Sequence, residues 1–276
     1  MRLDDNFILL SKQRNPFLYT ILVVCIPYRT MKLSSKRIFS IILFFGLAGI
    51  FVFWFHNNIV DIRRVLLPDT VMKKTVSEVL ADIGADASKR LLPWFERANV
   101  PYPPPQRLAL LGFKAEKRLE LWAETDASWT RIRSYPILAA SGVVGPKLRE
   151  GDHQVPEGIY RLNFLNPNSR FHLSMQINYP NDYDRRQAAQ EQRTNLGGEI
   201  FIHGKAVSVG CLAIGDEAIE ELFVLVATIG MDKVTVILAP QQDMQTVDIS
   251  APVRPWVPAL YADIFFRFPF SMISFQ

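Results

Sequence analysis

Residues 107–125 read RLALLGFKAEKRLELWAET, and this stretch decides the fold class. From residue 118 onward apolar and polar side chains alternate, which places Leu119, Leu121 and Ala123 on one side. Strict alternation is typical of a β-strand that buries one face. Residues 107–114 predict a neighbouring strand, so the stretch indicates a strand-rich domain.

The sequence downstream continues this pattern. Short apolar runs separated by turn residues predict further strands at 130–134 with 135–140, and at 159–164, 170–178, 199–202 and 234–239. One helix is expected after residue 211, with Asp216 as its cap and an apolar stripe behind it. The predicted fold is therefore mainly β with a few helices, in a domain over 107–250.

Upstream of this domain, residues 56–106 predict a helical and proline-rich region next to a membrane. Residues 69–99 favour a helix that Asp69 or Thr70 can cap, with interruptions at Gly84 and Pro93. The run PYPPP at 101–105 indicates a stiff linker. Residues 251–276 form an aromatic extension that either packs on the domain or touches the membrane surface.

Residues 38–55 read IFSIILFFGLAGIFVFWF and carry no charge. As a helix they would span about 27 Å, close to the ~30 Å core of a bilayer. Lys32, Lys36 and Arg37 precede the run and favour a cytoplasmic start, which sends the C-terminal part across the membrane. A cleaved signal peptide and a buried helix are the alternatives. The lack of an Ala-x-Ala pattern favours a retained transmembrane helix.

Residues 1–37 are expected to form a cytoplasmic tail. Residues 31–37 followed by the apolar run resemble the normal start of an exported protein, so residues 1–30 are interpreted as an overlong gene prediction. Under that interpretation Cys25 has no role.

The net charge of +4 is unevenly distributed. Residues 1–59 carry a net charge of +5 and the remainder −1. The main body therefore has no cationic excess with which to neutralise phosphates, and nucleic-acid binding is not expected.

The sequence offers no pattern for a metal or a cofactor. The four histidines lie at 56, 153, 172 and 203, and none has the His-x-x-x-His spacing of a helical zinc site. No Cys-x-x-Cys, glycine-rich phosphate loop or Gly-x-Ser-x-Gly elbow is present in the sequence. We expect no metal and no cofactor.

The stretch 202–212 reads IHGKAVSVGCL and contains the strongest chemical pattern. Cys211 follows His203 by eight residues, and an imidazole beside a thiol can generate and hold the reactive thiolate. The helix that begins near Asp216 would also favour the thiolate, and the amides of Gly204 and Gly210 can line an oxyanion hole. The alternative is a buried apolar cysteine next to a core histidine.

Several stretches, in the same order, resemble a known family. They are GPKLREGDHQVPEGIY at 145–160, FHLSMQINYPNDYD at 171–184, the His-Gly and Ser-Val-Gly-Cys parts of 202–211, and VTVILAP at 234–240. Together they resemble the catalytic domain of the L,D-transpeptidases, which has the YkuD-type fold, and within it the YafK-like branch. The resemblance covers about 100 residues.

The resemblance implies that Cys211 is the nucleophile and His203 the general base, with Ser208 and Gly210 in the signature around the thiol. It also implies a backbone carbonyl that orients the imidazole, which the sequence does not identify. Val209 and Ala213 depart from the common family pattern.

The implied substrates are peptidoglycan stem peptides, cut at diaminopimelate through an acyl-thioester. Transfer to a second stem gives a transpeptidase, whereas transfer to water gives a hydrolase that trims stems or releases a wall-attached lipoprotein. A non-catalytic, anchored wall-binding module and a Cys–His peptidase acting on protein remain alternatives. The expected location is the inner membrane, with a single span and the catalytic domain in the periplasm.

Three further residues are candidates for binding the stem peptide. Tyr179 and Asn181 lie in a loop that either binds the peptide or only makes a turn. His172 either supports the site, acts as the base, or has a structural role in its strand.

Overall fold

The computed structural model describes residue 49 and residues 73–104, 106–126, 128–248 and 254–267. The predicted tail at 1–37 lies outside the described residues, as does the predicted membrane segment at 38–55 apart from Gly49. Within the described ranges, no helix combines the length and apolarity needed to cross a bilayer. The elements from α2 to α5 belong to one compact unit, Val71–Gln276.

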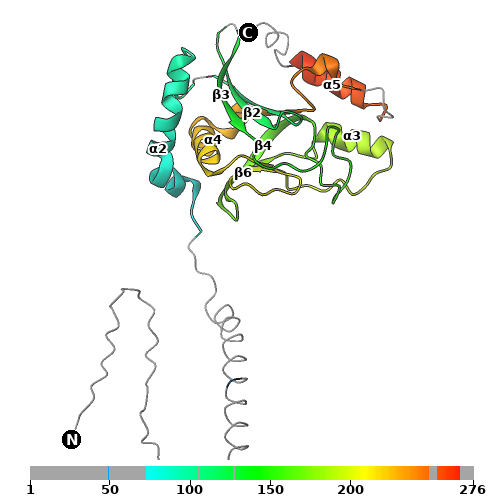
Figure 1. Cartoon of the computed structure of the whole chain (residues 1–276), viewed down its shortest axis with the longest axis horizontal. Coiled ribbons are helices and arrows are strands. Elements are labelled where there is room, and N and C mark those ends of the chain that lie inside the picture. The colour runs from blue at the N-terminus through cyan, green and yellow to red at the C-terminus, as the bar shows by residue number, and fades with distance from the viewer. Residues whose placement is uncertain (1–48, 50–72, 105, 127, 249–253, 268–276) are drawn as a thin grey trace, which may run out of the picture. The chain divides into compact units, whose positions relative to one another are not determined.

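Eight strands form a sheet in the order β3-β2-β1-β8-β4-β5-β6-β7. Figure 1 labels β2, β3, β4 and β6 of this sheet. The β1–β8 and β6–β7 pairs are parallel, and the other pairs are antiparallel. The strands are β1 Leu108–Phe113, β2 Arg118–Glu124, β3 Trp129–Pro136, β4 Gly158–Ser169, β5 His172–Ile177, β6 Phe201–His203, β7 Leu212–Ala213 and β8 Val234–Ala239. The prediction of a β-rich domain with a few helices is confirmed.

The strand predictions differ from the structure mainly in β4, β6 and β7. The strand expected at 159–164 continues to Ser169, because two register shifts let β4 bend and stay paired with β5. The strand expected at 199–202 is displaced to Phe201–His203. The two-residue strand β7 is too short to give a periodic signal.

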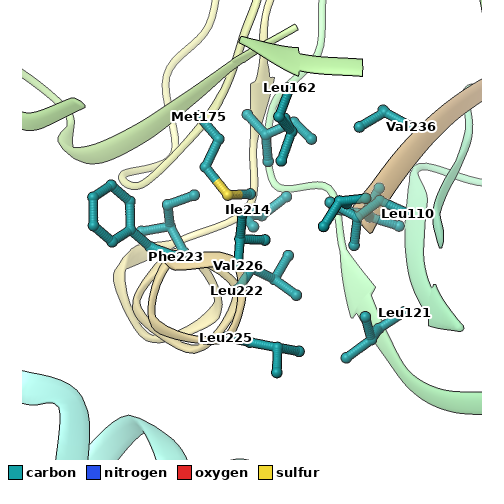
Figure 2. Packing of buried hydrophobic residues seen from close by; sticks show 14 of the residues in the cluster. Leu110, Leu121, Leu162, Met175, Ile214, Leu222, Phe223, Leu225, Val226 and Val236 are labelled. Atoms are coloured by element: carbon teal, nitrogen blue, oxygen red, sulfur yellow. The ribbon is translucent and has the colours of Figure 1, made fainter. Parts of the chain in front are cut away.

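The helices are α2 Val76–Arg97, α3 Asp182–Gln190, α4 Asp216–Ile229 and α5 Val257–Arg267, with 3-10 turns at Met231–Lys233 and Met244–Thr246. Helix α4 packs on one face of the sheet. Figure 2 shows Leu222 and Val226 of α4 among the apolar side chains of the strands, including Leu110 and Val236. Burial of these side chains supplies the main driving force for folding.

Helix α2 packs against α4 and shares its core through Leu91 and Phe95. The predicted cap at Asp69 or Thr70 is wrong, because Thr75 forms a capping box with Glu78 and the helix begins at Val76. The predicted interruptions are also wrong, since α2 runs through Gly84 and Pro93. The proline linker after α2 lies within the same unit as the sheet.

Helix α5 covers the opposite face of the sheet, where Leu260 and Ile264 pack on Leu111 and Ile237. Of the two alternatives for residues 251–276, the described part therefore packs on the domain. A buried polar link accompanies this packing, because the Tyr261 hydroxyl donates to Glu157 at 2.6 Å.

The chain that follows β3 reaches the other end of the sheet. The amide of Leu138 donates to the carbonyl of Ala213 at 2.8 Å, and the amide of Ala213 donates to the carbonyl of Ala139 at 2.9 Å. The strand order is thus nearly closed on itself at β7, and residues just after 140 lie beside the Cys211 loop.

Candidate active site

Strands β6 and β7 bring the predicted catalytic pair to one face of the sheet. Ile202 pairs with Leu212, and both side chains are buried in the core that contains α4. Because successive strand residues point to opposite faces, His203 and Cys211 lie on the other face, as diagonal neighbours across the two strands.

The Cys211 thiol is half-buried and contacts backbone groups. The amide of Phe201 donates to Sγ at 3.4 Å, and the thiol lies 3.7 Å from the carbonyl oxygen of Glu199. Burial raises the pKa of the Cys211 thiol, and the Glu199 charge raises it further, while the Phe201 amide and Lys147 lower it. The predicted thiolate-favouring effect of the α4 end does not dominate, so the resting sulfur is a thiol.

His203 is buried and oriented by a backbone carbonyl. Its Nδ1 lies 2.6 Å from the carbonyl oxygen of Gly204, and its ring centroid lies 4.6 Å from that of Phe171. Burial lowers the pKa of His203, against a smaller raising effect of the Gly204 carbonyl. The ring is therefore neutral at pH 7, with Nδ1 as donor and the lone pair of Nε2 available. The orienting carbonyl that the sequence did not identify is that of Gly204.

In the part of the chain that the structure describes, the Cys211 sulfur and the His203 ring do not share a hydrogen bond. Catalytic hydrogen bonds are often long in an enzyme without substrate and tighten when substrate is bound. The arrangement is therefore compatible with a nucleophile and a base that engage in the substrate complex.

Ser208 fixes the backbone at Cys211. Its Oγ accepts from the amide of Cys211 at 3.0 Å and donates to the carbonyl oxygen of Cys211 at 2.6 Å. Both backbone groups of Cys211 are thereby occupied by one side chain.

The predicted oxyanion role of Gly204 and Gly210 is not supported. The amide of Gly210 donates to Oγ of Ser141 at 2.6 Å, and the amide of Gly204 donates to the carbonyl of Leu173 at 3.2 Å. Gly204 instead permits close packing, since an added Cβ would lie 2.6 Å from both Asp216 Oδ1 and the Phe171 carbonyl oxygen. Gly210 has a φ of +85°, a conformation that glycine adopts without strain.

Asp216 also differs from its prediction. Gly215 is the N-cap of α4, and Asp216 is the first helical residue. Its carboxylate accepts from the backbone amide and the Nζ of Lys205, both at 2.8 Å. It therefore anchors the loop that follows His203.

A polar groove adjoins the thiol. It encloses about 410 Å³, and its walls include Gly210, Glu199 and Ile200, close to Cys211 in the fold. Lys147 contributes a buried ammonium group that pairs with Asp152 at 2.6 Å. Glu150 and His153 also line the groove. Its charged lining suits a zwitterionic ligand.

The structure gives Tyr179 and Asn181 structural contacts in place of the predicted binding role. The Tyr179 ring is buried, its hydroxyl donates to the carbonyl of Leu196 at 3.3 Å, and burial raises its pKa. The side chain of Asn181 caps α3 and donates to the carbonyl of Ile159 at 2.9 Å. Their side chains are thus committed to holding the loop.

His172 lies at the start of β5 and contacts α4. Its Nε2 is 2.8 Å from Oε1 of Glu220, whose other oxygen binds Arg90 of α2 at 2.6 Å. His172 therefore links β5 to two helices, next to Phe171, which stacks on His203. This placement favours the supporting role among the alternatives.

Sequence reasoning missed Ser141 and Phe171 as parts of this site. Ser141 is far from the Cys211 loop in the sequence and reaches it only because the chain after β3 meets β7. Phe171 lay within a stretch already recognised as family-like, but no local pattern marks a ring that stacks on a histidine. Among the described residues, no group of three His, Cys, Asp or Glu side chains could hold a metal ion.

Comparison with known proteins agrees with this geometry. Residues 113–237 match the family model of the YkuD L,D-transpeptidase catalytic domain. Over 113 residues the chain is 38% identical to the putative L,D-transpeptidase YafK of Escherichia coli K12. The aligned stretch covers 40% of this chain and 44% of the relative. The chain thus spans less than half the length of the curated relatives that it matches.

Two solved structures are similar at lower identity. The helical cell shape determining protein Pgp2 of Campylobacter jejuni is 24% identical with a TM-score of 0.41, covering 49% of this chain and 48% of that one. Bd1075 of Bdellovibrio bacteriovorus is 23% identical with a TM-score of 0.38, covering 49% of each chain. The family match and the identity to YafK confirm the resemblance: residues 113–237 match the model of the YkuD L,D-transpeptidase catalytic domain, and the chain is similar to YafK over part of its length.

Proposed function

We propose that this protein is a peptidoglycan L,D-transpeptidase with Cys211 as nucleophile and His203 as general base. The observation that carries the proposal is the pairing of β6 with β7, which puts His203 and Cys211, the residue just before β7, on one side of the sheet, while the Gly204 carbonyl occupies Nδ1 of His203 and leaves the Nε2 lone pair as a proton acceptor. The family match to residues 113–237 supports acyl transfer as the reaction class.

In the first step, His203 takes the thiol proton as Cys211 attacks the carbonyl on the L-centre side of diaminopimelate. A C–S bond forms, the peptide C–N bond breaks, and the imidazolium returns the proton to the leaving amine. The product is an acyl-thioester on Cys211 and a free D-amino acid or attached group.

In the second step, the amine of another stem peptide attacks the thioester. The new amide joins two diaminopimelate residues, and the sulfur leaves as a thiolate that recovers a proton through His203. If water attacks instead, the product is a trimmed or released stem, which is the hydrolase alternative.

Without substrate, Cys211 and His203 are both neutral and do not form an ion pair. Burial raises the pKa of the Cys211 thiol and lowers the pKa of the His203 imidazole. A neutral thiol beside a neutral imidazole is therefore the ground state, and the thiolate forms when substrate is bound. Such a thiol reacts slowly with solvent oxidants but remains available to an oriented carbonyl.

The groove of about 410 Å³ next to Gly210 is the proposed binding site for the stem peptide. A diaminopimelate side chain ends in both an amine and a carboxylate. Lys147 and Glu150 in the groove offer opposite charges to such an end, although the Lys147 ammonium already pairs with Asp152.

The proposed location follows from the sequence. Residues 38–55 would anchor the chain in the inner membrane, with residues 1–37 in the cytoplasm and the catalytic domain in the periplasm. Residues 56–106 would connect the anchor to the domain. An anchored domain would remain close to its polymer substrate.

The test is mass spectrometry of muropeptides after incubation with the full chain. The key variant is Cys211→Ala, and the matched control is Cys25→Ala, which removes the other cysteine of the chain. New cross-linked dimers made by the wild type and the Cys25 variant, and absent with the Cys211 variant, are the expected result.

Two other outcomes would replace the proposal. Shortened stems or freed lipoprotein fragments, again dependent on Cys211, would identify a hydrolase. Identical muropeptide profiles with and without the Cys211 thiol would favour an anchored, non-catalytic wall-binding module.

A further inference from the structure

A basic groove runs along the outer edge of β3. It encloses about 500 Å³ between α2 and the β2–β3 pair. Four successive residues, 131–134, line it. Because successive strand residues face opposite sides of a sheet, a groove lined by four in a row must follow the strand's edge. β3 is the terminal strand of the described sheet and pairs with β2 alone, so alternate backbone groups on its outer edge are available.

The groove carries more positive than negative charge. Four guanidinium groups line it, from Arg97, Arg118, Arg131 and Arg133, against the single lining carboxylate of Glu120. Arg118 and Arg131 share that carboxylate at 3.0 and 3.5 Å. This excess stands out because residues 60–276 together carry a net charge of −1.

The guanidinium groups differ in how tightly they are held. Arg133 stacks on Trp94 and Tyr135 and pairs with the buried Glu221 at 2.8 Å. Arg97 is exposed and also stacks on Trp94, with its guanidinium carbon 5.0 Å from the centroid of the ring. The Arg131 side chain is 50% exposed. Arg97 can therefore turn toward a ligand without breaking an ion pair, and Arg131 can do so while Arg118 keeps its 3.0 Å contact with the buried Glu120 carboxylate.

We propose that this groove binds an extended acidic segment of a partner protein, which adds to the edge of β3 as a further strand. Strand addition gives affinity through main-chain hydrogen bonds, and side chains on alternate residues give specificity. Carboxylates on such a segment would form charge-assisted hydrogen bonds with Arg97 and Arg131. Stem peptides fit less well, since their D-centres disfavour a regular strand against an L-chain edge.

The proposal does not rest on the proposed catalytic function. The groove is built mainly from α2, β2 and β3, and it shares no lining residue with the groove next to Cys211. A protein without transpeptidase activity could still bind a partner here.

The test measures binding of a fluorescent, acetylated hexapeptide that alternates glutamate and valine to the full chain. The double variant Arg97→Glu with Arg131→Glu is expected to weaken binding by at least about tenfold, and binding should also weaken with added salt. Arg186→Glu, an exposed charge reversal on α3, is the matched control and should bind as the wild type does. Equal affinity of the double variant and the wild type would overturn the proposal, as would no binding of the peptide.

A second arm needs no change to the protein. The same peptide with alternate backbone amides methylated keeps its charge but loses the donors for strand pairing, so we expect its binding to be lost. Retained binding would show a purely electrostatic contact and overturn strand addition. Muropeptide monomers that bind this groove more tightly than the acidic peptide, with loss in the double variant, would overturn the choice of a protein segment.

Discussion

Strands β1 and β2 are joined over six residue pairs, whereas β6 and β7 are joined over two. All six residues of β1 are buried, and the strand is paired with β2 on one side and β8 on the other. The β6–β7 region depends instead on side chains that bind the backbone, such as Ser208 at Cys211 and Ser141 at Gly210. The domain therefore separates stability from chemistry, because its most regular strands carry no candidate catalytic group.

The largest effect is expected for His203→Gln in the β6–β7 region. Glutamine can keep a hydrogen bond to the Gly204 carbonyl but has no basic nitrogen. We expect kcat for muropeptide cross-linking to fall by about 10²–10⁴-fold, with the melting temperature nearly unchanged. An active variant would show that another group is the base, and His172→Gln would then be the variant to compare.

The opposite behaviour is expected for Leu110→Ala in β1. Leu110 is fully buried in the core that it shares with α4, so its truncation leaves a cavity. We expect the free energy of unfolding to fall by about 2–5 kcal/mol, while kcat per folded molecule stays constant. Urea denaturation measures the loss, and Leu92→Ala at an exposed position of α2 is the matched control. A large loss of kcat in the folded Leu110 variant would contradict the separation of the two regions.

The pH dependence of kcat/KM tests whether His203 acts as a neutral general base. Burial lowers the pKa of His203 below its ordinary value of 6.5, and a general base must be neutral. Activity should therefore rise about tenfold per pH unit on an acidic limb below pH 6.5 and be level from there through neutral pH. An alkaline limb, on which activity falls as an imidazolium loses its proton, would instead indicate a thiolate–imidazolium pair in the free enzyme.

The smallest effect is expected for Ser208→Ala. This change removes the two hydrogen bonds that fix the backbone of Cys211, at a cost of about 1–2 kcal/mol in stability. We expect kcat/KM to fall by roughly tenfold, because the thiol is less well positioned. Ser208→Thr keeps the hydroxyl and should restore most of the activity. An alkylation rate of Cys211 that does not change in the alanine variant would argue against this positioning role.

The sequence predicts the two regions with unequal success, for a physical reason. β2 was predicted from its alternation and β1 from the apolar stretch beside it, each within a residue or two of its bounds. The pairing of His203 and Cys211 was predicted from chemistry and family resemblance, but the contacts around them were not. Ser141 reaches Gly210 through a tertiary meeting of distant segments, and amides proposed for an oxyanion hole are used by the fold.

Helix positions show the same limit. The apolar spacing of α2 and α4 was sufficient to predict both helices, but not their first residues. Thr75 and Gly215 are the caps, because local hydrogen bonding and backbone conformation decide where a helix starts. Asp216, expected as a cap, is held by Lys205 instead.

The bridge between Ala139 and Ala213 bears on how the protein reaches its active form. This contact joins segments that are far apart in the chain, and forming it requires the closure of a long loop. Contacts of this kind are slow to form, because the entropy of closure is lost before the contact stabilises anything. The Cys211 loop, which rests on this bridge and on Ser141, should therefore order late in folding, after the β1–β2 hairpin. A chain that is still being synthesised would then hold its candidate nucleophile unassembled until the rest of the domain is in place.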